Sequence, residues 1–172
     1  MPDLILWHAP KSRSTRVLWL LHEIGCPFEL RLLPAAERLD PPKPPALQDG
    51  ETRMHETGAM IEWLCETRGQ DLWRPPGGAG RIGWLDWLHF GETLLTRLDG
   101  PPEKLDAALD LLEGHFEDSE WLLGSFSGAD CQLAISLWVI RREGRLGARK
   151  RISGYLDRCL IRAACREAVA VA

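Results

Sequence analysis

The chain has 172 residues, which is long enough to bury one ample hydrophobic core or two small ones. Its apolar residues make up 45% and its charged residues 27%, proportions typical of a soluble globular protein, and no apolar run approaches the roughly 20 residues that span a bilayer. The net charge of −4 provides no general attraction for nucleic acid. We therefore expect neither a membrane nor a nucleic acid as a partner.

The five cysteines are scattered, with no C-x-x-C pair and no spacing typical of a zinc site. Their odd number argues against a disulfide framework, and we interpret them as buried, reduced thiols. The N-terminus, Met1-Pro2-Asp3, has no basic segment ahead of its short apolar run, so a secretory signal is not expected. These features predict a cytoplasmic protein that binds no metal.

The first thirty residues predict a strand, a helix and a second strand. Residues 4–7 are an uninterrupted apolar run, which is typical of a central strand buried on both faces. A helix follows, starting at Ser12 or Ser14 and capped at its end by Gly25. Residues 28–32 then alternate between apolar and polar, which predicts a half-buried strand near an edge. Such a βαβ unit should have a right-handed crossover.

The next segment changes character at a run of prolines. Residues 34–45 contain five prolines and leave room for only about one turn of helix. Asp49-Gly50 lies between two short runs that contain apolar residues, a strong hairpin signal because glycine accepts the positive φ of a tight turn. The paired strands are predicted at 46–48 and 52–55. Glu56-Thr57 then opens an apolar helix.

No strand pattern recurs beyond the Pro- and Gly-rich segment that follows Trp73. Apolar residues at helical spacing instead predict helices at about 81–98, 103–117 and 152–169. A further helix begins near Ser127, which forms a capping box with Asp130. The sequence thus predicts an α/β domain, a linker and an all-helical domain, at residues 1–73, 74–80 and 81–172.

The order of these features, and the residues themselves, resemble the glutathione-binding half of the glutathione S-transferase family. In that family a residue followed by cis-proline leads into a hydrophobic strand, a turn, a second strand and a Glu/Gln-Ser/Thr pair that opens a helix. The corresponding residues here are Pro44-Pro45-Ala46-Leu47, Asp49-Gly50, Met54-His55 and Glu56-Thr57. The Ser127 cap also resembles a family feature. The resemblance implies a fold with an α/β thioredoxin-like N-terminal domain and an all-α C-terminal domain.

Ser12 and Ser14 are the candidates for the catalytic hydroxyl. They lie where the loop after the first strand meets the first helix, which is the family position of the group that stabilises the glutathione thiolate. A free thiol, with a pKa of about 8.5, is mostly protonated at neutral pH, and a hydroxyl that donates to sulfur favours the thiolate. The resemblance favours Ser12 over Ser14. The alternative is that both are helix caps or loop residues, and Arg16 is interpreted as a salt-bridged structural residue.

The resemblance also implies residues that bind the rest of glutathione. Glu56 and Thr57 match the pair that holds the γ-glutamyl amine and carboxylate, although both can be helix caps instead. Pro45 matches the cis-proline. Pro44 departs from the family, where the preceding residue pairs with the cysteinyl part of glutathione through its N–H and its C=O. Proline has no N–H, so one bond is lost at about 0.5–1.5 kcal/mol.

Trp84 and Trp87, in the first helix after the linker, are candidates to line a site for a hydrophobic electrophile. Packing in the core or at an interface is the alternative, because tryptophan is enriched in both.

The function implied by the resemblance is conjugation of glutathione, as co-substrate, to small hydrophobic electrophiles, in a homodimer of the kind that family members commonly form. One alternative is a non-catalytic binding or assembly module that kept the fold and lost glutathione, which Pro44 and the shortened second helix favour. Another is glutathione-dependent peroxide reduction or thiol–disulfide exchange, which the absence of cysteine from residues 11–14 disfavours.

Overall fold

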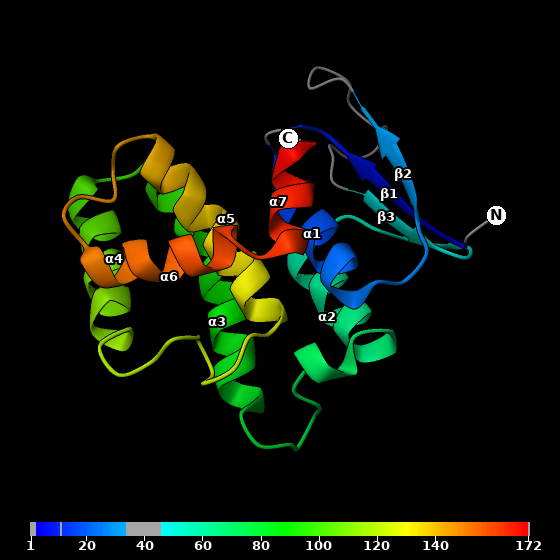
Figure 1. Ribbon diagram of the computed structural model, residues 1–172, viewed down its shortest axis with the longest axis horizontal. Coiled ribbons are helices and arrows are strands. Elements are labelled where there is room, and N and C mark those ends of the chain that lie inside the picture. The colour runs from blue at the N-terminus through cyan, green and yellow to red at the C-terminus, as the bar shows by residue number, and fades with distance from the viewer. Residues whose placement is uncertain (1–2, 11, 34–45, 172) are drawn as a thin grey trace.

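The computed structural model describes residues 3–10, 12–33 and 46–171. Figure 1 shows a sheet at one end of the molecule, α3 to α6 at the other, and α1, α2 and α7 between them. In chain order the elements are β1 (Leu4–His8), α1 (Ser14–Ile24), β2 (Glu29–Leu32), β3 (Ala46–Asp49), β4 (Thr52–Met54), α2 (Thr57–Thr67), η1 (Gln70–Leu72), α3 (Arg81–Leu94), η2 (Leu95–Arg97), α4 (Pro102–His115), α5 (Gly128–Arg142), α6 (Lys150–Leu160) and α7 (Ala163–Ala170).

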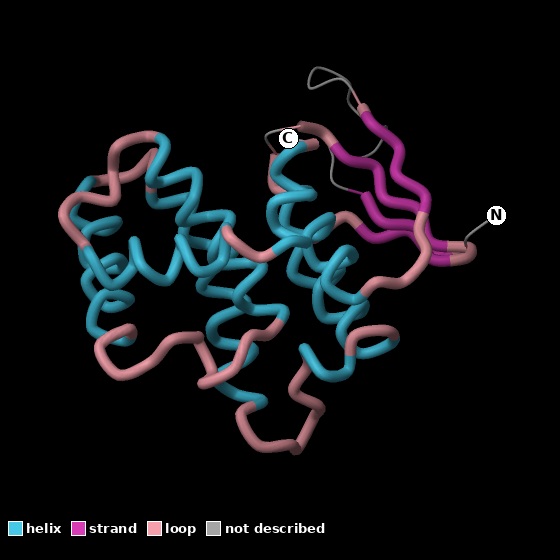
Figure 2. The backbone as a smooth tube through the Cα atoms, viewed as in Figure 1, coloured by secondary structure: helices cyan, strands magenta, loops and turns pink. Residues whose placement is uncertain are grey.

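The four strands form one mixed sheet in the order β2-β1-β3-β4 (Figure 2). β1 runs parallel to β2 and antiparallel to β3, while β3 and β4 form an antiparallel hairpin. The interior place of β1 explains its uninterrupted apolar sequence, and β2 lies at an edge as its alternating pattern predicted. The predicted order, β-α-β followed by β-β-α, is confirmed.

Several predicted element boundaries differ from the structure by one or two residues, and two of the predictions were wrong in a way that changes a turn or a helix. Asp49 was assigned to the hairpin turn but belongs to β3 and pairs with Thr52, so that Gly50 and Glu51 make the turn. Gly50 is the residue that supplies the positive φ, at 58°. The predicted last helix is two helices, α6 and α7. The chain is extended at Arg162, with φ −62° and ψ 135°, which turns α7 back onto α1.

The hydrophobic core runs without a break from the sheet into the helices. α1 is buried along residues 14–21, and the first ten residues of α5, 128–137, are buried as well. α5 packs against α1, α2 and α3. The predicted capping box forms at its start, where the Asp130 carboxylate accepts hydrogen bonds from the backbone N–H of Ser127 at 2.8 Å and from its hydroxyl at 3.0 Å. This packing places the start of α1 next to α5.

Candidate functional site

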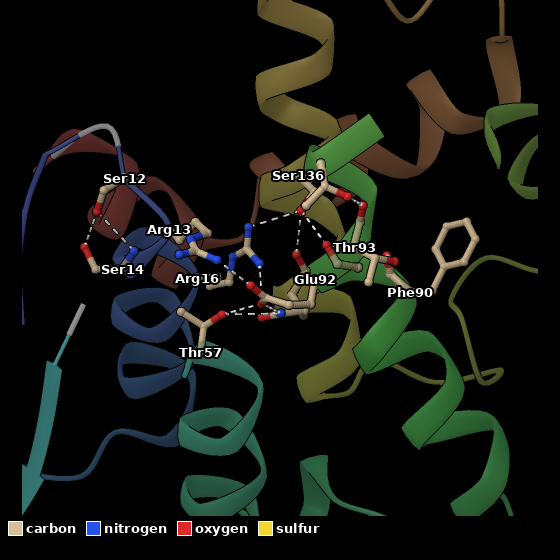
Figure 3. Close-up of polar contacts among 12 residues, drawn as sticks. Ser12, Arg13, Ser14, Arg16, Thr57, Phe90, Glu92, Thr93 and Ser136 are labelled. Atoms are coloured by element: carbon tan, nitrogen blue, oxygen red, sulfur yellow. Dashed lines mark hydrogen bonds and ion pairs between the residues drawn. The ribbon is translucent and has the colours of Figure 1, made fainter. Parts of the chain in front are cut away.

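The loop from β1 to α1 brings both candidate serines to one place (Figure 3). The Ser12 and Ser14 hydroxyl oxygens lie 2.8 Å apart, and the backbone N–H of Ser14 donates to Ser12 Oγ at 3.2 Å. Ser14 is fully buried and its Oγ lies 2.6 Å from Nδ1 of His8, the last residue of β1. Ser12 is half-buried. The two hydroxyls therefore differ in their access to a ligand, although only Arg13 separates them in sequence.

A pocket of about 200 Å³ opens beside Ser12. It lies against the C-terminal half of α5 and is lined by Ser12, Ile135, Trp138, Val139, Arg142 and Glu143. No sequence pattern marks Trp138 as a site residue, because its spacing is that of any amphipathic helix. The pocket joins a hydroxyl at the start of α1 to an apolar wall.

His8 is a buried, uncharged imidazole behind these serines. Its side chain is inaccessible to solvent, and burial lowers its pKa from 6.5 to about 4. Its Nε2 has no hydrogen-bond partner among the residues that the structure describes. At neutral pH this ring therefore carries one proton, on one of its two nitrogens.

Glu92 of α3 joins the sheet-containing part to the helical part (Figure 3). Its carboxylate accepts hydrogen bonds from the Thr57 hydroxyl at 2.5 Å and from Arg13 at 2.8 Å, and also from Gln132. Burial by itself would raise the pKa of the Glu92 carboxyl, but the Thr57 hydrogen bond, the positive charges of Arg16 and Arg13, and the Gln132 hydrogen bond together lower it below its ordinary value. Glu92 is therefore held as a carboxylate.

Arg16 forms the ion pair that its sequence position predicted. Its fully buried guanidinium donates to Glu92 Oε2 at 3.1 Å and to Ser136 Oγ at 3.1 Å. Burial lowers the Arg16 pKa to about 10, with Glu92 acting in the opposite direction, so the group stays positive at neutral pH. No sequence signal identifies Glu92 as the partner, because the two residues lie 76 positions apart.

The two predicted γ-glutamyl ligands point in different directions. Glu56 is exposed and forms the extended N-cap of α2, without a side-chain capping bond. Thr57 is 2% exposed, and its hydroxyl is directed at Glu92. The other two predicted glutathione ligands, Pro44 and Pro45, and the shortened second helix lie outside the described residues.

Trp84 and Trp87 lie away from the pocket beside Ser12. Trp84 is fully buried, and its indole N–H donates to the carbonyl of Leu72 at 3.2 Å. Trp87 packs against Phe90 and His115, with ring centroids 5.5 and 4.6 Å away. Neither residue lines that pocket, and their assignment to a substrate site stays a prediction.

Within the described residues, no group of His, Cys, Asp and Glu side chains could hold a metal ion. In the same part of the chain, no helix has the length and apolar character needed to cross a membrane. All five cysteines are free thiols, and each is buried except Cys26, which is half-buried.

The mixed sheet with α1 and α2, followed by helices α3 to α7, is a thioredoxin-like domain joined to an all-α domain. Residues 6–72 match the family model of the glutathione S-transferase N-terminal domain. Glutathione S-transferase 3 of Schizosaccharomyces pombe is 24% identical over 183 aligned positions, which cover 81% of this chain and 75% of the relative.

Solved structures agree over almost the whole chain. A glutathione transferase from Methylococcus capsulatus strain Bath is 26% identical, with a TM-score of 0.86 and 97% of both chains covered. A sphingomonad glutathione S-transferase complexed with glutathione is 20% identical, with a TM-score of 0.83, covering 96% of this chain and 97% of that one. The N-terminal part of the protein thus matches the glutathione S-transferase family, and the whole chain has the fold of glutathione S-transferases of known structure.

Proposed function

We propose that this protein is a glutathione transferase in which the Ser12 hydroxyl stabilises the glutathione thiolate for attack on a hydrophobic electrophile. The observation that carries the proposal is the pocket beside Ser12, whose apolar wall comes from Ile135, Trp138 and Val139. A thiolate held at the hydroxyl would lie at the mouth of a site suited to an apolar molecule.

Solvent access and hydrogen bonding favour Ser12 over Ser14 as the group that meets sulfur. The Ser14 hydroxyl is buried and lies within hydrogen-bonding distance of His8, Ser12 and both backbone groups of Ala9. Ser12 is half-buried and lines the pocket. Ser14 is therefore better suited to support Ser12 than to contact a ligand.

The start of α2 is the proposed site of the γ-glutamyl end. The first backbone N–H groups of a helix have no partner within the helix and favour a carboxylate, while the exposed Glu56 carboxylate can pair with the ammonium. Because the Thr57 hydroxyl already donates to Glu92, the backbone N–H of Thr57 would serve the ligand in its place. The sphingomonad relative complexed with glutathione supports this ligand class.

The second candidate is a non-catalytic binding or assembly module, and the hydroxyl of Thr57 favours it. A residue that family resemblance assigns to glutathione instead binds a carboxylate of the same chain. Pro44, which has no N–H to offer, acts in the same direction.

Calorimetric titration of the purified protein with reduced glutathione distinguishes the two candidates. We expect binding at micromolar to low-millimolar Kd and a raised melting temperature. No heat up to about 10 mM glutathione, with an unchanged melting temperature, would favour the non-catalytic module.

Ser12→Ala then tests the chemical role. We expect conjugation of a chlorinated nitroaromatic to fall about 10- to 100-fold, the effect of losing one hydrogen bond to a charged group. Ser153→Ala, which removes a hydroxyl of α6 that donates to the carbonyl of Arg149, is the matched control and should keep the wild-type rate. Wild-type activity in Ser12→Ala would refute the assignment.

The proposal extends to the cytoplasmic location, the homodimer and the domain limits at residues 1–73, 74–80 and 81–172. Size-exclusion chromatography with light scattering checks the homodimer, and a monomeric mass would contradict it.

A further inference from the structure

Three side chains form a line of hydrogen bonds from the pocket into the interior. Ser12 lines the pocket, its Oγ lies 2.8 Å from Ser14 Oγ, and Ser14 Oγ lies 2.6 Å from His8 Nδ1. Exposure falls along the line, from the half-buried Ser12 to Ser14 and His8, which are both inaccessible to solvent. Because the interior end is sealed from solvent, each buried donor there needs an acceptor within the protein.

Two donors in the line are fixed by the backbone. The N–H of Ala9 donates to Ser14 Oγ at 3.2 Å, and the N–H of Ser14 donates to Ser12 Oγ at 3.2 Å. What varies is the position of three protons, one on each hydroxyl and one on the uncharged imidazole. The direction of the whole line therefore depends on which nitrogen of His8 holds its proton.

With the proton on Nε2, the line runs inward. Ser14 must then donate to the bare Nδ1 of His8, and its contact with Ser12 requires Ser12 to donate to it. Ser12 keeps no proton for the pocket and faces it only as an acceptor. The Nε2–H would also be buried without an acceptor among the described residues.

With the proton on Nδ1, the line runs outward. His8 and the N–H of Ala9 then fill both lone pairs of Ser14 Oγ. The Ser14 proton has two acceptors within reach, Ser12 Oγ at 2.8 Å and the carbonyl of Ala9 at 3.3 Å, and the shorter contact with Ser12 is a hydrogen bond only if Ser14 donates to it. Ser12 accepts from the hydroxyl and from the N–H of Ser14, and its own proton is free for the pocket. Only a bare lone pair on Nε2 remains unpaired, and an unpaired acceptor is tolerated in protein interiors more often than an unpaired N–H.

We propose that His8 and Ser14 are positioning residues that direct the hydroxyl proton of Ser12 into the pocket, where it meets the sulfur of a bound thiol. This inference rests on the proposed function for the identity of that thiol. The order of the hydrogen bonds is a property of the protein without ligand. It can therefore be tested separately.

The first test uses the ligand-free, isotope-labelled protein at neutral pH. A long-range proton–nitrogen correlation spectrum distinguishes the protonated from the bare nitrogen of each imidazole, and His8→Asn identifies the signals of residue 8. We expect a neutral ring protonated at Nδ1. A ring protonated at Nε2, or at both nitrogens, would overturn the proposal whether or not glutathione binds.

The second test measures the pKa of bound glutathione from the ultraviolet absorbance of its thiolate. His8→Leu removes the donor, and we expect the thiol pKa to rise by about one unit. His8→Asn is the rescue variant, because its amide N–H can occupy the position of Nδ1–H, and we expect a value close to that of the wild type. If His8 had only a structural role, neither substitution would change the thiol pKa of bound glutathione. Thermal melting first shows that both variants are folded.

A double-mutant cycle tests whether His8 acts through Ser12. In a Ser12→Ala background, His8→Leu should not change the thiol pKa further, because its effect passes through Ser12. Equal thiol pKa values in wild type, His8→Leu and His8→Asn would refute the positioning role. If the wild type bound no glutathione at all, the proposed function would fail, while the tautomer measurement would still decide the direction of the line.

Discussion

At the scale of single residues, Arg16 and Glu92 form an ion pair that is largely buried. The Arg16 side chain is fully buried and the Glu92 side chain is 21% exposed, with 3.1 Å between Nη1 and Oε2. A buried ion pair adds little net stability, but removing one partner leaves an uncompensated buried charge. Glu92 is therefore expected to be essential to stability regardless of any catalytic role.

We expect Glu92→Gln to lower the free energy of unfolding by about 3 kcal/mol, because Arg16 would remain buried without a counter-charge. Urea denaturation followed by circular dichroism measures the difference. Glu117→Gln is the matched control. Its carboxylate pairs with the exposed Arg151 at 2.8 Å, and such surface pairs contribute at most about 1 kcal/mol. Equal effects of the two substitutions would contradict the role given to Glu92.

The buried His8 predicts a loss of stability in mild acid. Its pKa is about 4 in the folded protein against 6.5 ordinarily, so the unfolded chain takes up a proton at higher pH than the native state does. Stability should therefore be intact above about pH 6.5 and decrease as the pH falls towards 4. We expect the His8 contribution to cost about 1–2 kcal/mol by about pH 5.

The variant His8→Asn provides the control for this pH dependence, because it has no group to titrate at this position. Denaturant unfolding of both proteins at several pH values should show a smaller acid loss in the variant, while the effects of the carboxylates and of the other histidines are common to both. Parallel stability curves would show that His8 does not titrate as stated.

At the scale of elements, the start of α5 packs closely against α2. A Cβ added at Gly128 would lie 2.6 Å from the sulfur of Cys65 and 3.0 Å from a methyl carbon of Ile61, both in α2. Cys65 and Ile61 are fully buried, so neither can move aside without disturbing the core. The glycine allows α5 to pass directly over α2.

We expect Gly128→Ala to destabilise the protein by about 1–3 kcal/mol through overpacking. The matched control is Gly114→Ala in α4, where a new Cβ would meet no atom within 4 Å and the better helix former should stabilise by about 0.5–1 kcal/mol. Thermal melts of the two variants should shift in opposite directions. A stabilising Gly128→Ala would contradict the close approach of α5 to α2.

The elements were predictable where the signal is local. Gly25, with φ 70°, ends α1, and the Ser127–Asp130 box begins α5, because caps and turns are set by a few neighbouring residues. The division between α6 and α7 could not be predicted. No Gly or Pro marks it, and Arg162 is held by contacts with residues distant in sequence. Its guanidinium pairs with Glu23 at 2.6 Å and lies 3.8 Å from the ring centroid of Phe126.

The candidate site divides in the same way. The serines at the start of α1 could be identified from the strand–loop–helix order, which is a local pattern. The apolar wall from α5 and the Glu92 cluster could not be identified, because they form only when segments 35 or more positions apart in the sequence meet. The direction of the Thr57 side chain could not be predicted from the sequence either. A threonine at the start of a helix can turn its hydroxyl towards a ligand or, as here, towards Glu92.

At the scale of the whole molecule, one buried cluster includes residues of the sheet, of α1 and α2, and of α3 to α7. Arg16 crosses the same boundary, joining α1 to α3 and α5. A core shared in this way gives neither part a separate hydrophobic interior. The two parts should therefore unfold together.

Hydrogen exchange under native conditions tests this coupling. The slowest amides of β1 and of α5 should report opening free energies that agree within about 1 kcal/mol, since both require global unfolding. Gly128→Ala should lower both by the same amount. If the β1 amides exchanged through a separate opening of much lower free energy, the thioredoxin-like part would be an independent folding unit.

The contact of α7 with α1 has a consequence for biosynthesis. Glu23 of α1 and its partner Arg162 are 139 positions apart. α7, which contains the buried Cys165 and Ala168, packs against α1. A ribosome delivers α1 long before α7, so the surface of α1 that α7 covers stays open on the nascent chain during most of translation. We expect chaperones that recognise apolar segments to bind this chain while it is being made, and to be released when the segment that forms α7 emerges.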